Sequence, residues 1–199
     1  MRTASLLIIL LFTTAATFAQ DNWKLTRDRD GIRVYQADGT GFRNIKVECT
    51  LAGTLGGFER ILRNVGEFHS WVYANKEAKL LRTAGPDEYF YYTETSLPWP
   101  LQNRDAAIHA RFERDPKGSW LRLTETSEAG LVPVKSGKVR VARSSISWMV
   151  TQKAPGQLHI IYIFQADPGG SIPPVVANAF ADKGPYESFK KLARLLSIK

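Results

Sequence analysis

Apolar and polar residues alternate along most of the chain, and this pattern predicts a protein built mainly from β-strands. The dipeptide Asp30-Gly31 separates the first two alternating segments and is a typical hairpin turn. Later segments are bounded by Gly, Pro and Asp residues that favour turns. About nine strands are predicted, over residues 23–28, 32–38, 42–51, 76–83, 87–96, 104–114, 119–128, 138–151 and 157–167.

Between the third and fourth predicted strands the apolar period becomes that of a helix. Thr54 can cap the start of this helix, and Gly66 is expected to end it. A short second turn would carry Phe68 and Trp71. The residues that share the apolar face of the helix are Phe58, Ile61, Leu62 and Val65.

A longer helix is predicted at the end of the chain. Ser171 can cap it, and Pro173 and Pro174 suit its first turn. Gly184-Pro185 predicts a kink or a break near Lys183, because proline disturbs a helix interior. Its apolar face comprises Val176, Ala179, Phe180, Phe189, Leu192, Ala193 and Leu196.

These elements predict an α+β fold. Short connections favour antiparallel neighbours, and a twisted sheet of this length curls. The final helix is the only predicted element long enough to cover the concave face. We therefore expect a curved antiparallel sheet of about nine strands wrapped around a long C-terminal helix, with one small helical insert after the third strand. Periodicity alone leaves open whether the space between them is packed solid or holds a ligand.

The first 19 residues have the pattern of a secretory signal peptide. Met1-Arg2 is cationic, an apolar run follows, and small residues precede a cut after Ala19. A membrane anchor is the alternative, but the apolar run is shorter than the ~20 residues that span a bilayer. The sequence predicts export to the periplasm or the medium, with residues 20–199 as a single mature domain.

The chain has a net charge of +8 at pH 7. Such a charge either attracts anionic surfaces or simply keeps the protein soluble. Lys and Arg are scattered, so we expect no nucleic-acid partner. Cys49 is the only cysteine and lies in an apolar strand pattern, which indicates a buried structural thiol rather than a nucleophile.

Sequence motifs for hydrolases, metalloproteases and nucleotide-binding proteins are missing from the chain. The three histidines, His69, His109 and His159, fall on three different predicted elements, so nothing local supports a metal site. We expect no cofactor and no metal.

Arg104 opens an apolar strand whose inward face carries small residues. A charge beside such a face must be paired or hydrogen-bonded, and Glu94 is the nearest candidate partner across the Pro98-Trp99-Pro100 corner. The pair could be purely structural. Alternatively, Arg104 could anchor the headgroup or hydroxyl of a ligand.

The chain resembles the START family, the StAR-related lipid-transfer domains. The resemblance rests on four pieces that span nearly the whole predicted mature chain. They are Trp23 with Asp30-Gly31-Ile32-Arg33-Val34-Tyr35; Tyr91-Tyr92 with Pro98-Trp99-Pro100 and Asn103-Arg104-Asp105; Pro133 with Gly137-Lys138-Val139-Arg140; and Asp167-Pro168-Gly169-Gly170-Ser171-Ile172-Pro173 with Asn178. The chain departs from the family at Pro174-Val175, where a bulky residue is common.

The resemblance implies a helix-grip fold that binds a lipid, a sterol or another hydrophobic ligand in an internal tunnel, without enzymatic activity. It also implies a gate formed by the last helix and a loop within residues 130–137, and it matches Arg104 to the family's buried arginine. We expect a tunnel of about 300–1,000 Å³. The expected ligand-binding residues are Arg104, Glu94, Tyr92, Ala106, Ile108, Ala110, Phe112, Val176, Ala179 and Phe180.

Two other functions remain open at this stage. One is an enzyme of the related cyclase or hydrolase branch that acts on a hydrophobic substrate in the same cavity. The other is a peripheral module that contacts an anionic membrane transiently through its positive surface. In each case we expect a monomer.

Overall fold

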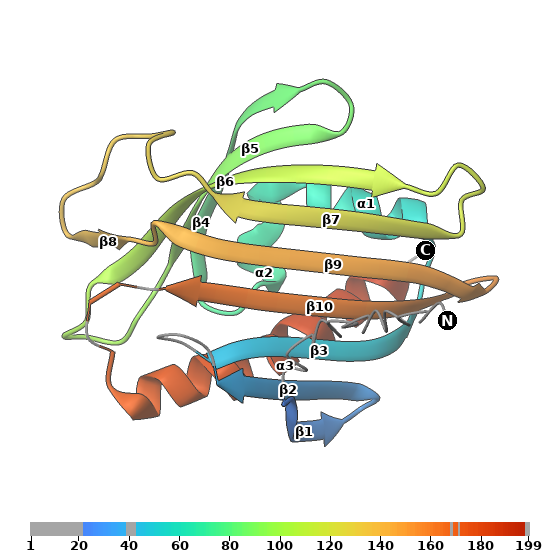
Figure 1. Cartoon of the computed structure of the whole chain (residues 1–199), viewed down its shortest axis with the longest axis horizontal. Coiled ribbons are helices and arrows are strands. Elements are labelled where there is room, and N and C mark those ends of the chain that lie inside the picture. The colour runs from blue at the N-terminus through green and yellow to red at the C-terminus, as the bar shows by residue number, and fades with distance from the viewer. Residues whose placement is uncertain (1–21, 39–42, 168, 171, 198–199) are drawn as a thin grey trace, which may run out of the picture.

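The computed structural model describes residues 22–38, 43–167, 169–170 and 172–197. It confirms the α+β class and the curved antiparallel sheet with a long C-terminal helix. Within these residues the sheet has ten strands rather than about nine, in the order β1-β2-β3-β10-β9-β7-β6-β5-β4, with β8 paired to β6. Figure 1 shows the three α-helices on one side of the sheet.

The strand bounds follow the alternating segments closely. They are β1 Lys24–Arg29, β2 Ile32–Asp38, β3 Arg43–Ala52, β4 Asn75–Ala84, β5 Glu88–Thr95, β6 Asn103–Arg114, β7 Trp120–Ser127, β8 Lys138–Arg140, β9 Arg143–Ala154 and β10 Gln157–Asp167. The first hairpin turns at Asp30 and Gly31, whose φ angles are 54° and 73°. Two successive positive φ values fit a turn whose twist matches the strands it joins.

The helical insert consists of α1 Leu55–Arg63, a 3₁₀ turn η1 Val65–Glu67 and a short helix α2 Phe68–Trp71. The Thr54 side chain accepts a hydrogen bond from Gly57 N at 3.1 Å, so the predicted N-cap is confirmed. The prediction that the helix ends at Gly66 is wrong. The C-cap is Asn64, whose N–H bonds back to Arg60 and Ile61, and the chain tightens into η1 from there.

The single strand predicted over residues 138–151 is two strands in the structure. β8 runs parallel to the start of β6, and Val141 N then donates to Asp105 O at 2.8 Å. From there the chain crosses to the far side of β7, where β9 pairs antiparallel with β7 and β10. Apolar residues alternate on both sides of the crossing, at Val139 and Val141 and again at Ile146, Trp148 and Val150, so the two strands were predicted as one although the phase of the alternation changes between them.

The last helix, α3 Pro174–Ser197, is continuous, with Pro185 inside it, so the helix does not break at Lys183. It contacts β1, β2 and β3 as well as α1 and α2, and it lies behind β2 and β3 in Figure 1. Its second half is the more deeply buried, through Tyr186, Phe189, Leu192 and Leu196. The predicted cap, Ser171, and the predicted signal peptide lie outside the described residues.

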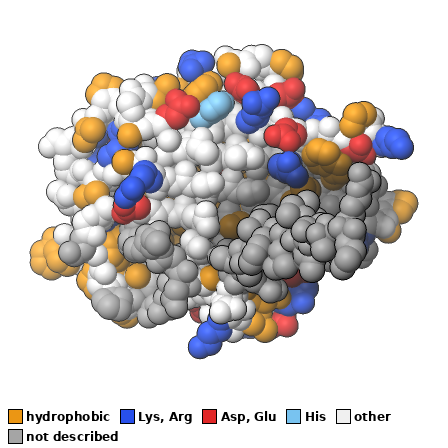
Figure 2. Space-filling model, viewed as in Figure 1, with side chains coloured by type: hydrophobic (Ala, Val, Ile, Leu, Met, Phe, Trp, Pro, Cys, Tyr) orange, Lys and Arg blue, Asp and Glu red, His pale blue; other side chains and the backbone are white. Residues whose placement is uncertain are grey.

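The face of the molecule seen in Figure 2 carries Lys and Arg interspersed with Asp and Glu. The scattered charge of the sequence is therefore scattered on this face as well. No helix among the described residues is long and apolar enough to cross a membrane.

Candidate functional site

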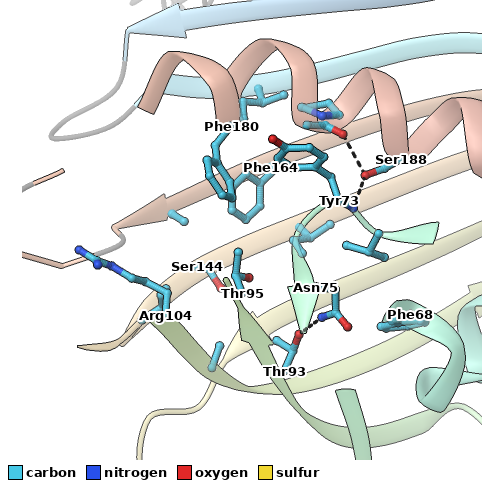
Figure 3. Close-up of a pocket in the computed structure, with 18 of the residues that line it drawn as sticks. Phe68, Tyr73, Asn75, Thr93, Thr95, Arg104, Ser144, Phe164, Phe180 and Ser188 are labelled. Atoms are coloured by element: carbon cyan, nitrogen blue, oxygen red, sulfur yellow. Dashed lines mark hydrogen bonds between the residues drawn. The ribbon is translucent and has the colours of Figure 1, made fainter. Parts of the chain in front are cut away.

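A cavity of about 690 Å³ lies between the concave face of the sheet and α3. Figure 3 shows side chains from the sheet, from the segment after α2 and from α3 around it. Its walls are mainly apolar and aromatic, as is usual for ligand sites. The aromatic lining residues are Phe68, Trp71, Tyr73, Tyr91, Trp148, Tyr162, Phe164, Phe180 and Phe189.

Five of the ten expected ligand-binding residues lie in this lining: Arg104, Ala106, Ile108, Val176 and Phe180. Their contact with a ligand stays a prediction. Ala110 and Phe112 also face inward but belong to the packed core, where Tyr89 lies opposite Ala110 and stacks on Phe112 at 5.9 Å. Ala179 is half-buried on α3 and does not line the cavity.

Arg104 lies at one end of the cavity, on the opposite side of the labelled residues from Phe68 in Figure 3. The residue is only 7% exposed. Its Nη1 donates to Gln102 O at 2.7 Å, and its Nη2 donates to Gly169 O at 2.9 Å. Burial lowers the pKa of the guanidinium, but an arginine stays charged near neutral pH. Arg104 therefore brings a positive charge to the cavity and ties β6 to the segment that precedes α3.

Glu94 and Tyr92 lie on the other face of the sheet, outside the cavity lining. The register of β5 and β6 places Thr95 opposite Arg104 and Glu94 opposite Asp105, so alternation turns Glu94 away from Arg104. Glu94 forms ion pairs with Lys138 and with Lys76, and it accepts a hydrogen bond from Asn103 at 2.7 Å. The expected Glu94–Arg104 partnership is thus replaced by a pairing with lysines.

The environment of Glu94 strongly favours its charged form. Burial alone would raise the pKa of this carboxyl, but the hydrogen bonds from Lys138, Asn103 and Lys76 lower it to about 2. The side chain is 1% exposed. Glu94 is therefore a buried, compensated carboxylate that fixes β5 to β4 and β8.

Asp105 and Arg140 form a second buried ion pair. Arg140 Nε donates to Asp105 Oδ1 at 2.8 Å, and Nη2 donates to Oδ2 at 3.0 Å. The remaining guanidinium hydrogens go to the carbonyl oxygens of Ala129, Val132 and Pro133. Two of the four sequence pieces that carry the family resemblance, those that contain Asp105 and Arg140, thus meet in space and order the connection between β7 and β8.

Residues 130–137 belong to the connection between β7 and β8, and residues 133–137 are exposed. Within this loop, Lys135 Nζ lies 3.8 Å from the centroid of the Tyr92 ring. The cavity lining includes Glu125, which precedes the loop in sequence, and Val141, which follows it. None of residues 130–137 belongs to the lining. The role of this loop as a gate stays a prediction.

Glu125 is a polar lining residue that the sequence analysis missed. The carboxyl accepts a hydrogen bond from Tyr91 Oη at 2.6 Å and another from Trp148 Nε1 at 3.0 Å. Burial raises its pKa, although both hydrogen bonds act in the opposite direction. Alternation could have found it, because Leu121, Leu123 and Glu125 share one face of β7.

The segment after α2 contacts α3 and completes the cavity wall between these two helices. Tyr73 N donates to Ser188 Oγ at 2.9 Å, and Ser188 Oγ donates to Gly184 O at 2.9 Å. The Tyr73 ring also meets Phe180 edge-on at 5.4 Å. A Cβ at position 184 would lie 3.0 Å from Tyr73 Cδ1, so glycine permits this close approach.

The remaining candidate groups stay apart from the cavity. Cys49 is buried in β3, and burial raises the pKa of its thiol to about 12, so it is an inert structural thiol. His69, His109 and His159 lie on α2, β6 and β10. Within the described part of the chain, no group of three or more His, Cys, Asp or Glu could hold a metal ion.

Comparisons with a family model, with related sequences and with solved structures all indicate the same protein family. Residues 10–197 match the family model described as START domain. A protein of Pseudomonas aeruginosa is 28% identical over 190 residues, which cover 94% of this chain and 93% of that protein. Mouse phosphatidylcholine transfer protein is 24% identical over 180 residues, with coverages of 87% and 83%. A STAR-related lipid transfer protein from Xanthomonas axonopodis superposes with a TM-score of 0.79 and 29% identity over 88% of this chain and 99% of its own.

Proposed function

Because the chain belongs to the START domain family, we propose that it binds a lipid, a sterol or another hydrophobic ligand in the cavity beneath α3, without covalent chemistry. The observation that carries this proposal is the apolar, aromatic cavity of about 690 Å³. Protein interiors are otherwise close-packed, so a space of this size and lining is typical of a ligand site. The likeness to two proteins named as lipid transfer proteins supports the same function.

Native mass spectrometry of the mature protein, purified from an exporting host, tests this function. We expect a bound lipid or a saturable one-to-one complex with a fluorescent fatty acid or sterol. A protein that carries no adduct and binds none of these probes would refute ligand binding and leave only the fold.

Arg104 should contribute more to ligand affinity than to stability. We expect Arg104→Leu to lower the affinity by about tenfold, because a charged hydrogen-bond donor is lost from the cavity. The free energy of unfolding should fall by only about 1 kcal/mol, since the hydrogen bonds from Arg104 to Gln102 O and Gly169 O go to neutral backbone carbonyls. Fluorescence titration and urea unfolding measure the two quantities.

A matched control for this variant is Arg111→Leu. Arg111 lies on the same strand, pairs with Glu88 at 3.7 Å and has a side chain that is 63% exposed. Arg111→Leu should change neither the ligand affinity nor the free energy of unfolding appreciably. If Arg104→Leu instead costs about 3–5 kcal/mol of stability and leaves affinity unchanged, Arg104 is part of a structural ion pair.

We further propose that the protein acts as a carrier that contacts an anionic membrane transiently. Three exposed apolar residues support this: Trp99 is 93% exposed, Val175 is 73% and Val134 is 68%. Trp99 lies between β5 and β6, Val134 between β7 and β8, and Val175 in the first turn of α3. These segments come together near Arg104, because β8 pairs with the start of β6 and Arg104 bonds to Gly169 ahead of α3. Figure 1 places β8 and the first turns of α3 at the same, left-hand end of the molecule.

Vesicle sedimentation tests the membrane contact. We expect the protein to bind phosphatidylcholine vesicles that contain phosphatidylglycerol and to be released by salt, which screens charge. Trp99→Ala should weaken this binding severalfold, whereas Leu25→Ala, an exposed apolar residue on β1, should not. If both variants bind the vesicles equally well, Trp99 does not belong to a membrane-contact surface. Anionic vesicle binding by a protein whose cavity takes up no probe would favour the peripheral-module function instead.

An enzyme that acts on a hydrophobic substrate is the second candidate function. The observation that favours it is the Tyr91–Glu125 hydrogen bond, which puts an acid–base pair in the cavity wall. Incubation with candidate lipids and esters, scored for product, separates the two functions. A product that disappears in Glu125→Gln would replace the carrier proposal by an enzymatic one.

We also propose export of the protein, with a mature chain that begins at Gln20. The proposal rests on the cationic start, the apolar run and the small residues before Gln20. The intact mass of protein recovered from an exporting host should match residues 20–199. Recovery of the uncleaved chain in the membrane fraction would show an anchor.

A further inference from the structure

Glu125 is an acidic residue of the cavity lining that lies away from Arg104. Glu125 is 4% exposed, and it lies among the aromatic lining residues with Tyr91 and Trp148 as its hydrogen-bond donors. Ile108 on β6 pairs with Tyr91, whereas Arg104 pairs with Thr95. Arg104 and Ile108 are four positions apart along β6, which corresponds to roughly 13 Å. We call the surroundings of Tyr91 and Glu125 the Glu125 end and those of Arg104 the Arg104 end.

The Glu125 carboxyl can form more hydrogen bonds than the described residues supply. A carboxylate offers about four lone-pair positions, and Tyr91 and Trp148 occupy two of them. Tyr162 lines the cavity beside Trp148, with ring centroids 4.4 Å apart. Its hydroxyl has no hydrogen-bond partner within the described ranges of the chain. The Glu125 carboxyl and the Tyr162 hydroxyl can therefore each form further hydrogen bonds, and both residues line the same apolar cavity.

A wall needed only for packing would not carry this carboxyl. Burying an acidic group is costly, and apolar residues of similar volume often stabilise a core as well or better. Tyr91 and Trp148 compensate part of that cost by holding the carboxyl in one orientation. That orientation is useful to a ligand with a polar group at its inner end.

We infer that the Glu125 end recognises a hydroxyl group on the ligand, so that the cavity takes an elongated apolar molecule that is hydroxylated at the end remote from Arg104. This inference rests on the proposed binding function. A hydroxyl both donates and accepts, so it satisfies Glu125 in either protonation state and can also meet Tyr162. Burial raises the pKa of Glu125. An ammonium group would favour the ionised carboxylate, and a carbonyl would require the protonated acid.

Matched fatty acids test this recognition. Laurate, myristate and palmitate are each compared with the derivative that carries a hydroxyl on the terminal carbon, by displacement of a fluorescent fatty acid. In the wild-type protein we expect at least one hydroxylated acid to bind about tenfold more tightly than its parent. In Glu125→Leu that preference should vanish or reverse, because the buried hydroxyl loses its partner.

Glu125→Gln provides the folding control, since its amide can still accept from Tyr91 and meet a ligand hydroxyl. It should keep most of the preference. If Glu125→Leu does not fold, the wild-type comparison of parent and hydroxylated acids still tests the inference. A wild-type protein that binds parent and hydroxylated acids equally, or prefers the parents in every pair, would overturn the inference while ligand binding stands. Failure of all six acids to bind would count against the proposed function itself.

Discussion

Ala106→Trp should abolish or severely weaken ligand binding while the protein stays folded. Ala106 lies in the cavity wall between Arg104 and Ile108, and its small side chain leaves the space beside it open. An indole at this position would extend into the cavity. Overpacking of an interior costs about 1–3 kcal/mol, so the affinity should fall by roughly tenfold to a hundredfold. Titration with a fluorescent fatty acid measures the change.

Ala84→Trp is the control, because Ala84 is exposed at the end of β4 and does not line the cavity. It should bind like the wild type. Thermal unfolding of both variants confirms that they are folded. Unchanged affinity in a folded Ala106→Trp protein would mean that the ligand binds elsewhere. Ala110 is unsuitable for this experiment because it is fully buried in the core beside Tyr89, where a Trp would disturb the fold itself.

Arg140→Leu should destabilise the protein by about 3–5 kcal/mol. The Asp105 side chain is 0% exposed and that of Arg140 is 7% exposed. Removal of the guanidinium leaves a buried carboxylate without its two donors, together with three carbonyl oxygens of the β7–β8 connection. Urea unfolding monitored by tryptophan fluorescence measures the loss.

The matched control is Arg143→Leu, three residues along the chain. Arg143 pairs with Asp167 at 2.8 Å, but its side chain is 83% exposed, so the loss should be no more than about 1 kcal/mol. The double variant Asp105→Leu, Arg140→Leu should recover much of the lost stability, because no charge then stays buried. Equal effects of Arg140→Leu and Arg143→Leu would show that burial does not strengthen the Asp105–Arg140 pair.

Local patterns predicted most of the fold because each strand of this sheet has one inward face. Alternation located the strands, and Asp30-Gly31 located the first turn. The division between β8 and β9 could not be predicted in this way. It depends on a contact between Arg140 and Asp105, which are far apart in sequence, and no alternation records such a contact.

The candidate site was predictable only in part, for a related reason. Inward orientation could be derived for Ala106 and Ala110 alike, yet only Ala106 borders the cavity, because Tyr89 fills the space near Ala110. Glu94 was assigned to Arg104 by proximity in sequence, whereas the register of the hairpin sends them to opposite faces. Glu125 could have been predicted, because the alternation that places Leu121 and Leu123 on the inner face of β7 places Glu125 there as well.

Pro185 divides α3 into two segments with different mechanical roles. Proline has no N–H, so the helix lacks a backbone hydrogen bond at this point. Beyond it, Phe189 and Leu192 are anchored in the core; before it, Val176 and Phe180 are half-buried and border the cavity. The free energy needed to lift the first segment is therefore a local quantity, smaller than that of global unfolding. Under the proposed binding function, a ligand would enter or leave by movement of this first segment alone, without unfolding of the domain.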